Sequence, residues 1–274
     1  MKTPALDPEL VVALKRLKLG RMADTLPDRL TLADKQDFSF QELLLLMLTD
    51  EIGRRDSGAA QRRANEAGLD SAMRLELFDK TAKVSFDKRL LAELASLRFL
   101  EDQRHVVILG PVGVGKTFMA SALAHIACAH GYNVRFTRAD DMLRNLRASR
   151  LDNSRDAEMI ALTTVDLLVL DDFALEPMSK EESKDVYQLF IERTGRGSMI
   201  VTSNRDTAEW ISMFDDILLA QSAVDRFKNS AFDLVMEGES YRPRLKPQLD
   251  PSNPPPQTPA PKPQRHPRSR SKRR

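Results

Sequence analysis

The chain has 274 residues, of which 42% are hydrophobic and 30% are charged, and its formal net charge is +2. This composition is ordinary for a globular protein with enough core for one large or two modest domains. The single cysteine, Cys128, excludes an internal disulfide framework and a cysteine-rich zinc site. No apolar segment approaches the roughly 20 residues that span a bilayer, and the N-terminus lacks a signal-peptide pattern, so we expect a cytoplasmic protein without membrane association.

Residues 1–80 have the pattern of a small all-helical domain. Leu10–Leu19 places leucines on one face and basic residues on the other, which predicts an amphipathic helix that ends at Gly20. Ser39 and Glu42 have the spacing of a capping box, which predicts the start of a second helix. Two arginine pairs further along suit a surface that meets DNA phosphates. A solvated face balanced by nearby acidic residues explains them equally well.

The next segment leads into the strongest motif of the chain. The segment Ser85-Phe86-Asp87 provides a helix N-cap, which predicts a helix over residues 88–100. The apolar run 106–109 predicts a short buried strand of a parallel sheet. Residues 110–117 then give the complete P-loop sequence G-x-x-x-x-G-K-[ST], and an apolar helical stretch follows. This order of strand, P-loop and helix predicts a nucleotide-binding site.

The residue types of the P-loop indicate what it binds. Its glycines let successive N–H groups turn toward phosphate oxygens, and the following helix adds the positive end of its dipole. We expect Lys116 to reach the β- and γ-phosphates and the Thr117 hydroxyl to ligate Mg²⁺, so the expected cofactors are ATP and Mg²⁺. The predicted nucleotide-binding residues are Gly110, Pro111, Val112, Gly113, Val114, Gly115, Lys116, Thr117 and Phe118.

A second strand is predicted at residues 132–137, followed by a helix over residues 140–155. Arg144, Arg147 and Arg150 lie on one flank of this helix, although residues 101–242 as a whole carry a net charge of −7. Arginines that a helix turns to one side are candidate contacts to a DNA backbone. A solvated face paired with neighbouring acids is the alternative.

The segment VDLLVLDDF is the second strong motif. Its apolar strand ends in the paired carboxylates Asp171 and Asp172, which gives it the form of a Walker B element. We expect Asp171 to hold Mg²⁺ through its water shell and Asp172 to polarise the attacking water. Adjacent acids at the end of a buried strand are costly unless they serve a cation or a reaction.

A helix is predicted over residues 180–193, and the apolar segment SMIVTSN that follows predicts a strand with a polar end. In a doubly wound sheet this strand lies beside the Walker B strand, at the edge where ligands bind. The Asn204 amide is then a candidate to fix the water between Asp172 and the γ-phosphate. A simple strand-end turn is the alternative.

The C-terminal segment, residues 243–274, differs from the rest in composition. It carries a net charge of +8 and ten of the chain's 15 prolines. Such a segment does not bury a core, so we expect it to be disordered. Its charge predicts a non-specific, salt-sensitive attraction to nucleic acid.

Five motifs taken together resemble one known family. GPVGVGKT, LLVLDDF, MIVTSN, AVDRF and GESYR stand in the order and spacing typical of the IstB family. These are AAA+ ATP-binding helper proteins of insertion-sequence transposition, close to the DnaC-type helicase loaders. The resemblance runs from about Leu10 to Arg242 and includes the helical N-terminal module. It departs from the common pattern at Val112, where the family usually has a proline, a change that leaves the phosphate contacts intact.

The resemblance implies an α/β fold in which residues 81–242 form an AAA+ core with a parallel sheet and flanking helices. A small helical domain over residues 1–80, which binds DNA or a partner, precedes this core. Because the Pro-rich segment begins shortly after Arg226, we expect no lid domain of the kind found in larger AAA+ proteins. The resemblance further implies an added helical element before the Walker B strand, which strengthens the DNA-binding interpretation of the three arginines.

The resemblance also assigns roles that depend on assembly. AAA+ subunits associate head to tail with ATP between neighbours, so a homo-oligomer is expected. Asn204 takes the sensor 1 position, and Arg226 becomes the candidate arginine finger that reaches into the next subunit's site. Arg193 and Arg196 are weaker candidates for the finger. The candidate catalytic residues are therefore Asp172, Asn204 and Arg226, with Thr117 and Asp171 at the metal.

The function predicted from the sequence is that of an ATPase that regulates transposition. It would oligomerise on double-stranded DNA, select or remodel the target, and activate a partner transposase of the integrase-like type. A DnaC-like replicative helicase loader is the main alternative, since it has the same core and a different partner. A small-molecule nucleotide kinase and a DNA-coating protein that is indifferent to nucleotide are further alternatives.

Overall fold

The computed structural model describes residues 6–245, which divide into two compact units at residue 241. The second unit begins at Arg242, and its described part is a 3₁₀ helix, Arg242–Leu245. All but the first three residues of the predicted basic tail lie outside the described residues. Within residues 6–245, no helix is both long enough and apolar enough to cross a bilayer.

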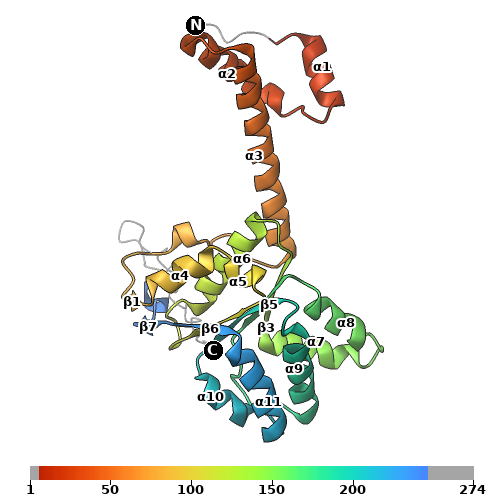
Figure 1. Cartoon of the computed structure of the whole chain (residues 1–274), viewed down its shortest axis with the longest axis vertical. Helices are drawn as coiled ribbons and strands as arrows, with labels where there is room; N and C mark the ends of the chain where they lie inside the picture. The colour runs from red at the N-terminus through yellow and green to blue at the C-terminus, as the bar shows by residue number, and fades with distance from the viewer. Residues whose placement is uncertain (1–5, 246–274) are drawn as a thin grey trace, which may run out of the picture. The chain divides into compact units, whose positions relative to one another are not determined.

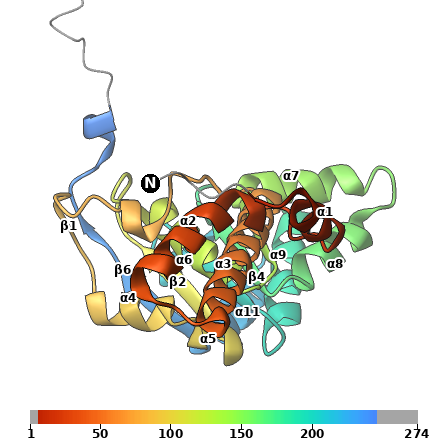
Figure 2. The ribbon, with the colours of Figure 1, turned by 90° about the horizontal axis from the view of Figure 1, so that it is seen from above.

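The N-terminal region is helical, as predicted. It contains α1 (Pro8–Arg16), α2 (Met22–Gln36) and α3 (Phe40–Glu66), and α2 packs against α3 (Figures 1 and 2). The predicted capping box opens α3: the Glu42 N–H donates to Ser39 Oγ, and the Ser39 N–H donates to the Glu42 carboxylate. The first helix ends earlier than predicted, because Lys18 rather than Gly20 adopts the left-handed conformation, at φ 59°.

The chain then passes to the core. The C-terminal end of α3 packs on α6 (Lys116–Ala129), where Arg63 Nε donates to the Cys128 carbonyl at 2.7 Å. Cys128 itself is buried, and burial raises its thiol pKa to about 11. The segment that follows α3 contains, in order, η1 (Leu75–Leu77), β1 (Val84–Ser85), α4 (Lys88–Ala95) and α5 (Arg98–Glu101).

The Asp87 cap is present, but the helix predicted over residues 88–100 is interrupted. The Asp87 carboxylate accepts the N–H groups of Arg89 and Leu90 at the start of α4. Leu97, at φ 64°, separates α4 from α5 and turns the chain toward the sheet. Leucine spacing predicts the buried face of this segment and gives no signal for the break.

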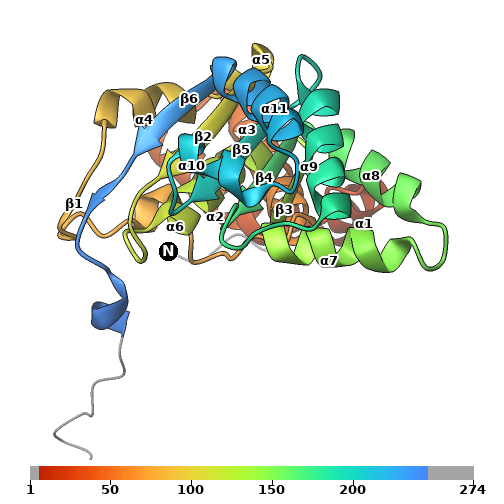
Figure 3. The ribbon, with the colours of Figure 1, turned by 90° about the horizontal axis from the view of Figure 1, so that it is seen from below.

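A five-stranded parallel sheet forms the centre of the core (Figure 3). Its order is β3-β4-β5-β2-β6, so the strand of the P-loop and the strand of the paired acids lie on either side of β5. The strands are β2 (His105–Leu109), β3 (Val134–Arg138), β4 (Leu167–Asp171), β5 (Ser198–Ser203) and β6 (Ala231–Val235).

Helices cover both faces of the sheet, because alternate strand residues point to opposite sides. Val106 and Ile108 pack toward α6, and Val107 packs toward the other layer. That layer contains α7 (Ala139–Ser149), α8 (Arg155–Thr163), α9 (Lys180–Arg193), α10 (Thr207–Trp210), η2 (Ile211–Met213) and α11 (Ile217–Asn229). Figure 3 shows α9 and α11 lying over the strands on this face.

Two further segments differ from the sequence prediction. The helix expected over residues 140–155 is two helices, since α7 and α8 are separated by a turn with Asn153 at φ 60°. After β6 the chain forms β7 (Glu237–Gly238), which pairs antiparallel with β1. This pairing places the segment just before residue 241 beside the P-loop.

Candidate nucleotide-binding site

The P-loop connects the end of β2 to the start of α6, as predicted. Gly113 and Gly115 adopt φ 86° and 100°, which only glycine adopts readily. Lys116 is 5% exposed, and its ammonium donates to the carbonyl oxygens of Gly110 and Pro111, each at 2.8 Å. It also donates to the side-chain oxygen of Asn204. The P-loop lysine is therefore held at the edge of the sheet where the strands end.

The paired acids differ in their surroundings. Asp171 is 3% exposed, and its carboxylate accepts the Thr117 hydroxyl at 3.0 and 3.1 Å. Burial raises the pKa of Asp171 above its usual value, and hydrogen bonds from Thr202 and Thr117 oppose that rise. Asp172 is more exposed and has left-handed backbone, at φ 55°. The two predicted magnesium-site residues, Thr117 and Asp171, are in direct contact.

The residues present suit a magnesium nucleotide. A buried carboxylate beside a hydroxyl provides the oxygen ligands that Mg²⁺ prefers, and the buried ammonium next to them provides charge for phosphates. Asn204 completes the group from the end of β5. Side chains from the start of α6 and from the ends of β4 and β5 thus lie at the same edge of the sheet, where the sequence placed Lys116, Asp171 and Asn204.

Sequence reasoning missed two residues of this site. Thr202 is fully buried, and its hydroxyl contacts both acids of the pair. Arg138, at the end of β3, places Nη2 3.5 Å from Asp172 Oδ2 and also binds Asp140. The polar end of β5 was a visible signal for Thr202. Arg138 follows a strand without any motif, and only the pairing of β3 with β4 brings it to the acids.

Residues 236–241, which we call the C-terminal strap, lie against the P-loop. The Met236 N–H donates to the Leu109 carbonyl at 2.7 Å, and the Tyr241 N–H donates to the Gly113 carbonyl at 2.8 Å. A Cβ on Gly113 would stand 2.1 Å from Ser240 Oγ, and one on Gly110 would stand 2.1 Å from the Met236 carbonyl. The strap thus requires glycine at two P-loop positions. It also contains the GESY sequence, which the sequence analysis used only to identify the family.

The arginine-finger candidates lie in different surroundings. Arg226 is exposed on α11, and its guanidinium makes no hydrogen bond or ion pair within residues 6–245. Arg193 is 0% exposed and donates to the carbonyls of Leu162, Asp166 and Ser198. A side chain buried in its own subunit does not reach a neighbour, so the weaker prediction for Arg193 is wrong. Arg196 is exposed beyond the end of α9.

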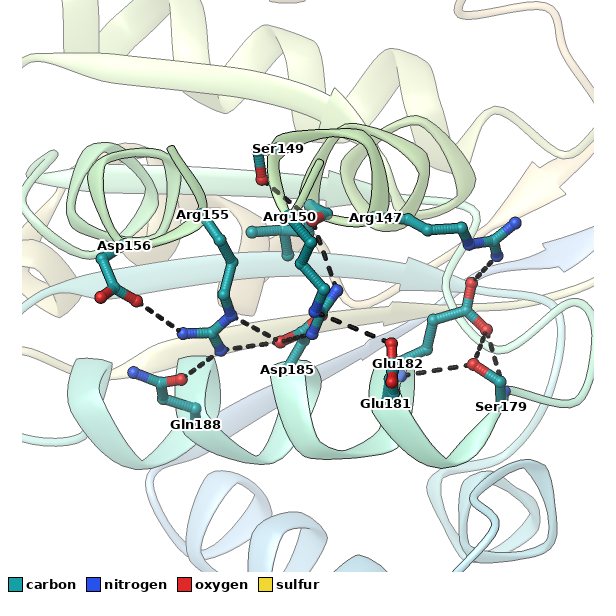
Figure 4. A network of polar contacts seen from close by, with 11 residues as sticks. Arg147, Ser149, Arg150, Arg155, Asp156, Ser179, Glu181, Glu182, Asp185 and Gln188 are labelled. Carbon is teal, nitrogen blue, oxygen red and sulfur yellow. Dashed lines mark hydrogen bonds and ion pairs between the residues drawn. The ribbon is translucent and has the colours of Figure 1, made fainter. Parts of the chain in front are cut away.

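The three candidate DNA-contact arginines are paired with acids, and Figure 4 shows the pairs of Arg147 and Arg150. Arg144 pairs with Asp141 on its own helix. Arg147 and Arg150 reach across to α9, where they bind Glu182 and the buried carboxylate of Asp185. The side chains of Arg144 and Arg147 are each 66% exposed, and that of Arg150 is 28% exposed. Their role toward DNA stays a prediction.

The fold and the site define the class of protein. A parallel sheet with the P-loop after a central strand, the acids two strands away and a polar residue between them is the arrangement of AAA+ P-loop proteins. The structure of the replication initiator DnaA bound to AMPPCP and single-stranded DNA is similar, with a TM-score of 0.51 and 23% identity over 62% of this chain and 51% of that chain. The structure of DnaI gives a TM-score of 0.52 and 20% identity over 60% of this chain and 90% of that one.

Sequence comparison gives the family. The model of the IstB-like ATP-binding proteins matches residues 12–249, and the chain belongs to this family. An insertion-sequence ATP-binding protein of Mycobacterium tuberculosis is 38% identical over 242 residues, which cover 88% of this chain and 96% of the relative. The ATP-binding protein of insertion sequence IS21 from Pseudomonas aeruginosa is 34% identical over 87% of this chain and 90% of the relative.

Proposed function

We propose that the protein is an ATPase that assembles on double-stranded DNA and regulates transposition. The observation that carries the proposal is the meeting of Lys116 with Asn204 beside the contact between Thr117 and Asp171. A site built in this way binds phosphates, a metal and a water at one sheet edge. The insertion-sequence relatives support transposition as the process that the ATPase serves.

The residues divide the work of hydrolysis. Lys116 and the P-loop N–H groups would hold the phosphates. Thr117 and Asp171 would hold a magnesium ion, which would neutralise charge on the phosphate oxygens. Asp172 orients and polarises the attacking water, with Asn204 beside it. Water adds to the γ-phosphorus as its bond to the ADP oxygen breaks, so the products are ADP and inorganic phosphate.

The exposed position of Arg226 supports a site completed by a second copy of the chain. Its side chain is on α11, outside the group formed by Lys116, Asp171 and Asn204. In a head-to-tail homo-oligomer it would stabilise charge on the neighbour's γ-phosphate. ATP would then favour assembly, and hydrolysis would release it.

DNA binding is proposed for the two helices α7 and α8. Arg144 and Arg147 are well exposed, and each pairs with a carboxylate, Asp141 and Glu182 respectively. A DNA phosphate can take the place of these carboxylates, because it also presents anionic oxygens to the guanidinium. Binding by exchange of partners predicts a strong dependence on salt. The proposed partner of the assembly is a transposase of the integrase-like type.

The test is DNA affinity of the full chain with ATP, ADP and no nucleotide, all with Mg²⁺. We expect tight binding only with ATP, and the Lys116→Ala variant should bind equally weakly in all three conditions. Equal affinity of the wild-type chain in all three conditions would contradict the proposal and favour a DNA-coating protein. Capture of a replicative helicase in place of a transposase would favour the loader alternative.

A further inference from the structure

Thr202 connects the two acids of the site through one hydroxyl group. The Asp172 N–H donates to Thr202 Oγ1 at 2.9 Å, and Thr202 Oγ1 donates to Asp171 Oδ1 at 2.6 Å. The directions are fixed, because an N–H only donates, an ionised carboxylate only accepts, and a hydroxyl has a single proton. Thr202 is fully buried, so water does not replace either bond.

The main chain of the same residue holds the next peptide. The Phe173 N–H donates to the Thr202 carbonyl at 2.8 Å, just beyond the last paired residues of β4 and β5, Leu170 and Val201. Thr202 therefore adds a backbone hydrogen bond between the two chain segments beyond the last residues that pair as regular strands. This matters for Asp172, whose left-handed φ of 55° persists only where its surroundings hold it.

We propose that Thr202 is a positioning residue that sets Asp171 and Asp172 relative to one another. The inference rests on the proposed ATPase function, in which the first acid holds the metal and the second faces the water. On one side the hydroxyl orients the Asp171 carboxylate that Thr117 also contacts. On the other side it holds the peptide from which the Asp172 carboxylate projects.

Replacing Thr202 with valine distinguishes the proposed role of the hydroxyl group from the contribution of the side-chain shape to packing. Valine keeps the branched shape and removes the hydroxyl, so the Asp172 N–H and one Asp171 oxygen each lose a partner. Serine keeps the hydroxyl and removes a methyl group. Partners that orient metal ligands in this way are typically worth about 10–100-fold in metal affinity or activity.

The experiment compares Thr202→Val and Thr202→Ser in the full chain. ATP hydrolysis is measured against Mg²⁺ concentration, and the affinity for a fluorescent ATP analogue is measured in EDTA. For the valine variant we expect kcat to fall about 10–100-fold and the Mg²⁺ concentration for half-maximal rate to rise about tenfold. Its affinity in EDTA should stay at the wild-type value, and the serine variant should hydrolyse ATP within about threefold of wild type.

Two results would overturn the inference while the proposed ATPase stands. One is a valine variant with the wild-type kcat and Mg²⁺ dependence, and the other is a serine variant as impaired as the valine variant. If Thr202→Val does not fold, Thr202→Ala provides the hydroxyl-free comparison with serine. A wild-type chain that hydrolyses no more ATP than Lys116→Ala would overturn the proposed function itself, and this inference with it.

Discussion

The Lys116 ammonium donates a hydrogen bond to the side-chain oxygen of Asn204, a residue 88 positions further along the chain. This contact joins the P-loop to the end of β5 across the sheet edge. It gives Asn204 a place at the site that does not depend on any family assignment. The P-loop and the residue after β5 that we propose to face the attacking water are thus in direct contact within one subunit.

Replacing Asn204 should affect the chemical step more than binding. Asn204→Ala removes the amide that we propose to face the attacking water, and it leaves the P-loop backbone unchanged. We expect kcat for ATP hydrolysis to fall about 10²–10³-fold with little change in KM. Steady-state kinetics test this, with Arg205→Ala as a control at the next residue, which binds the Ala174 carbonyl. A rise in KM without a change in kcat would contradict the assigned role.

Arg226 offers a test of the shared site. Arg226→Ala alone should lose about 10³-fold or more in kcat, because each site lacks the neighbour's guanidinium. Mixing it with Lys116→Ala should restore part of the activity, because the intact site of one variant meets the intact arginine of the other. Lys228→Ala, which changes another exposed cation on α11, should keep wild-type activity. No recovery on mixing would contradict the finger role of Arg226.

Gly113 is constrained by the C-terminal strap as well as by its own backbone. Gly113→Ala places a Cβ 2.1 Å from Ser240 Oγ at a φ of 86°, so we expect the free energy of unfolding to fall by about 1–3 kcal/mol. Adding Ser240→Gly should recover part of this loss. Thermal unfolding of the single and double variants measures both effects. If the single and double variants lose the same free energy of unfolding, the contact with Ser240 in the strap is not the cause of the destabilisation.

His105 makes stability depend on pH. Burial, and then the charge of Arg193, lower its pKa from 6.5 to about 4, while the ring stacks on Phe227 and its Nδ1 accepts the Met199 N–H. The unfolded chain takes up this proton below pH 6.5 and the folded chain does not. Stability should therefore fall as pH drops from 6.5 toward 4, by up to about 1.4 kcal/mol per pH unit. Urea unfolding at pH 7 and pH 5 should show a smaller loss for His105→Phe than for wild type.

Arg144 tests the proposed DNA contact. Arg144→Ala should weaken DNA binding and reduce the salt slope by about one ion, because a single phosphate contact is lost. Arg98→Ala is a matched control, since the Arg98 side chain is 67% exposed, against 66% for Arg144, and is likewise paired with an acid, Glu93. Filter binding at several salt concentrations measures both variants. An equal effect of the two substitutions would mean that only overall charge matters.

The sequence was most informative where local chemistry determines the structure. The P-loop, the acid-ended strand and α9 lie where they were predicted, because each is defined by neighbours in the chain. The break at Leu97 and the turn at Asn153 were missed, since non-glycine residues adopt left-handed backbone there without a local signal. The helix α2 was not predicted individually, because Arg21 provides no side-chain cap to mark its start.

The unpredicted part of the site depends on contacts between distant segments. Arg138 meets Asp172 through the pairing of β3 with β4, and the strap meets the P-loop through β6 and β7. Thr202 was visible as a polar strand end, yet its two hydrogen bonds appear only when β5 lies beside β4. Motif spacing identifies the residues proposed to bind the nucleotide better than the residues that hold them in place.

The most direct test of the account is the size of the assembly on DNA when hydrolysis is blocked. Asp172→Asn should bind Mg·ATP and not hydrolyse it, so sedimentation with double-stranded DNA and ATP should show a large complex that persists. The wild-type complex should shrink as ATP is consumed, and Lys116→Ala should form none. Complexes of the same size and lifetime in all three proteins would contradict the claim that this site controls assembly on DNA.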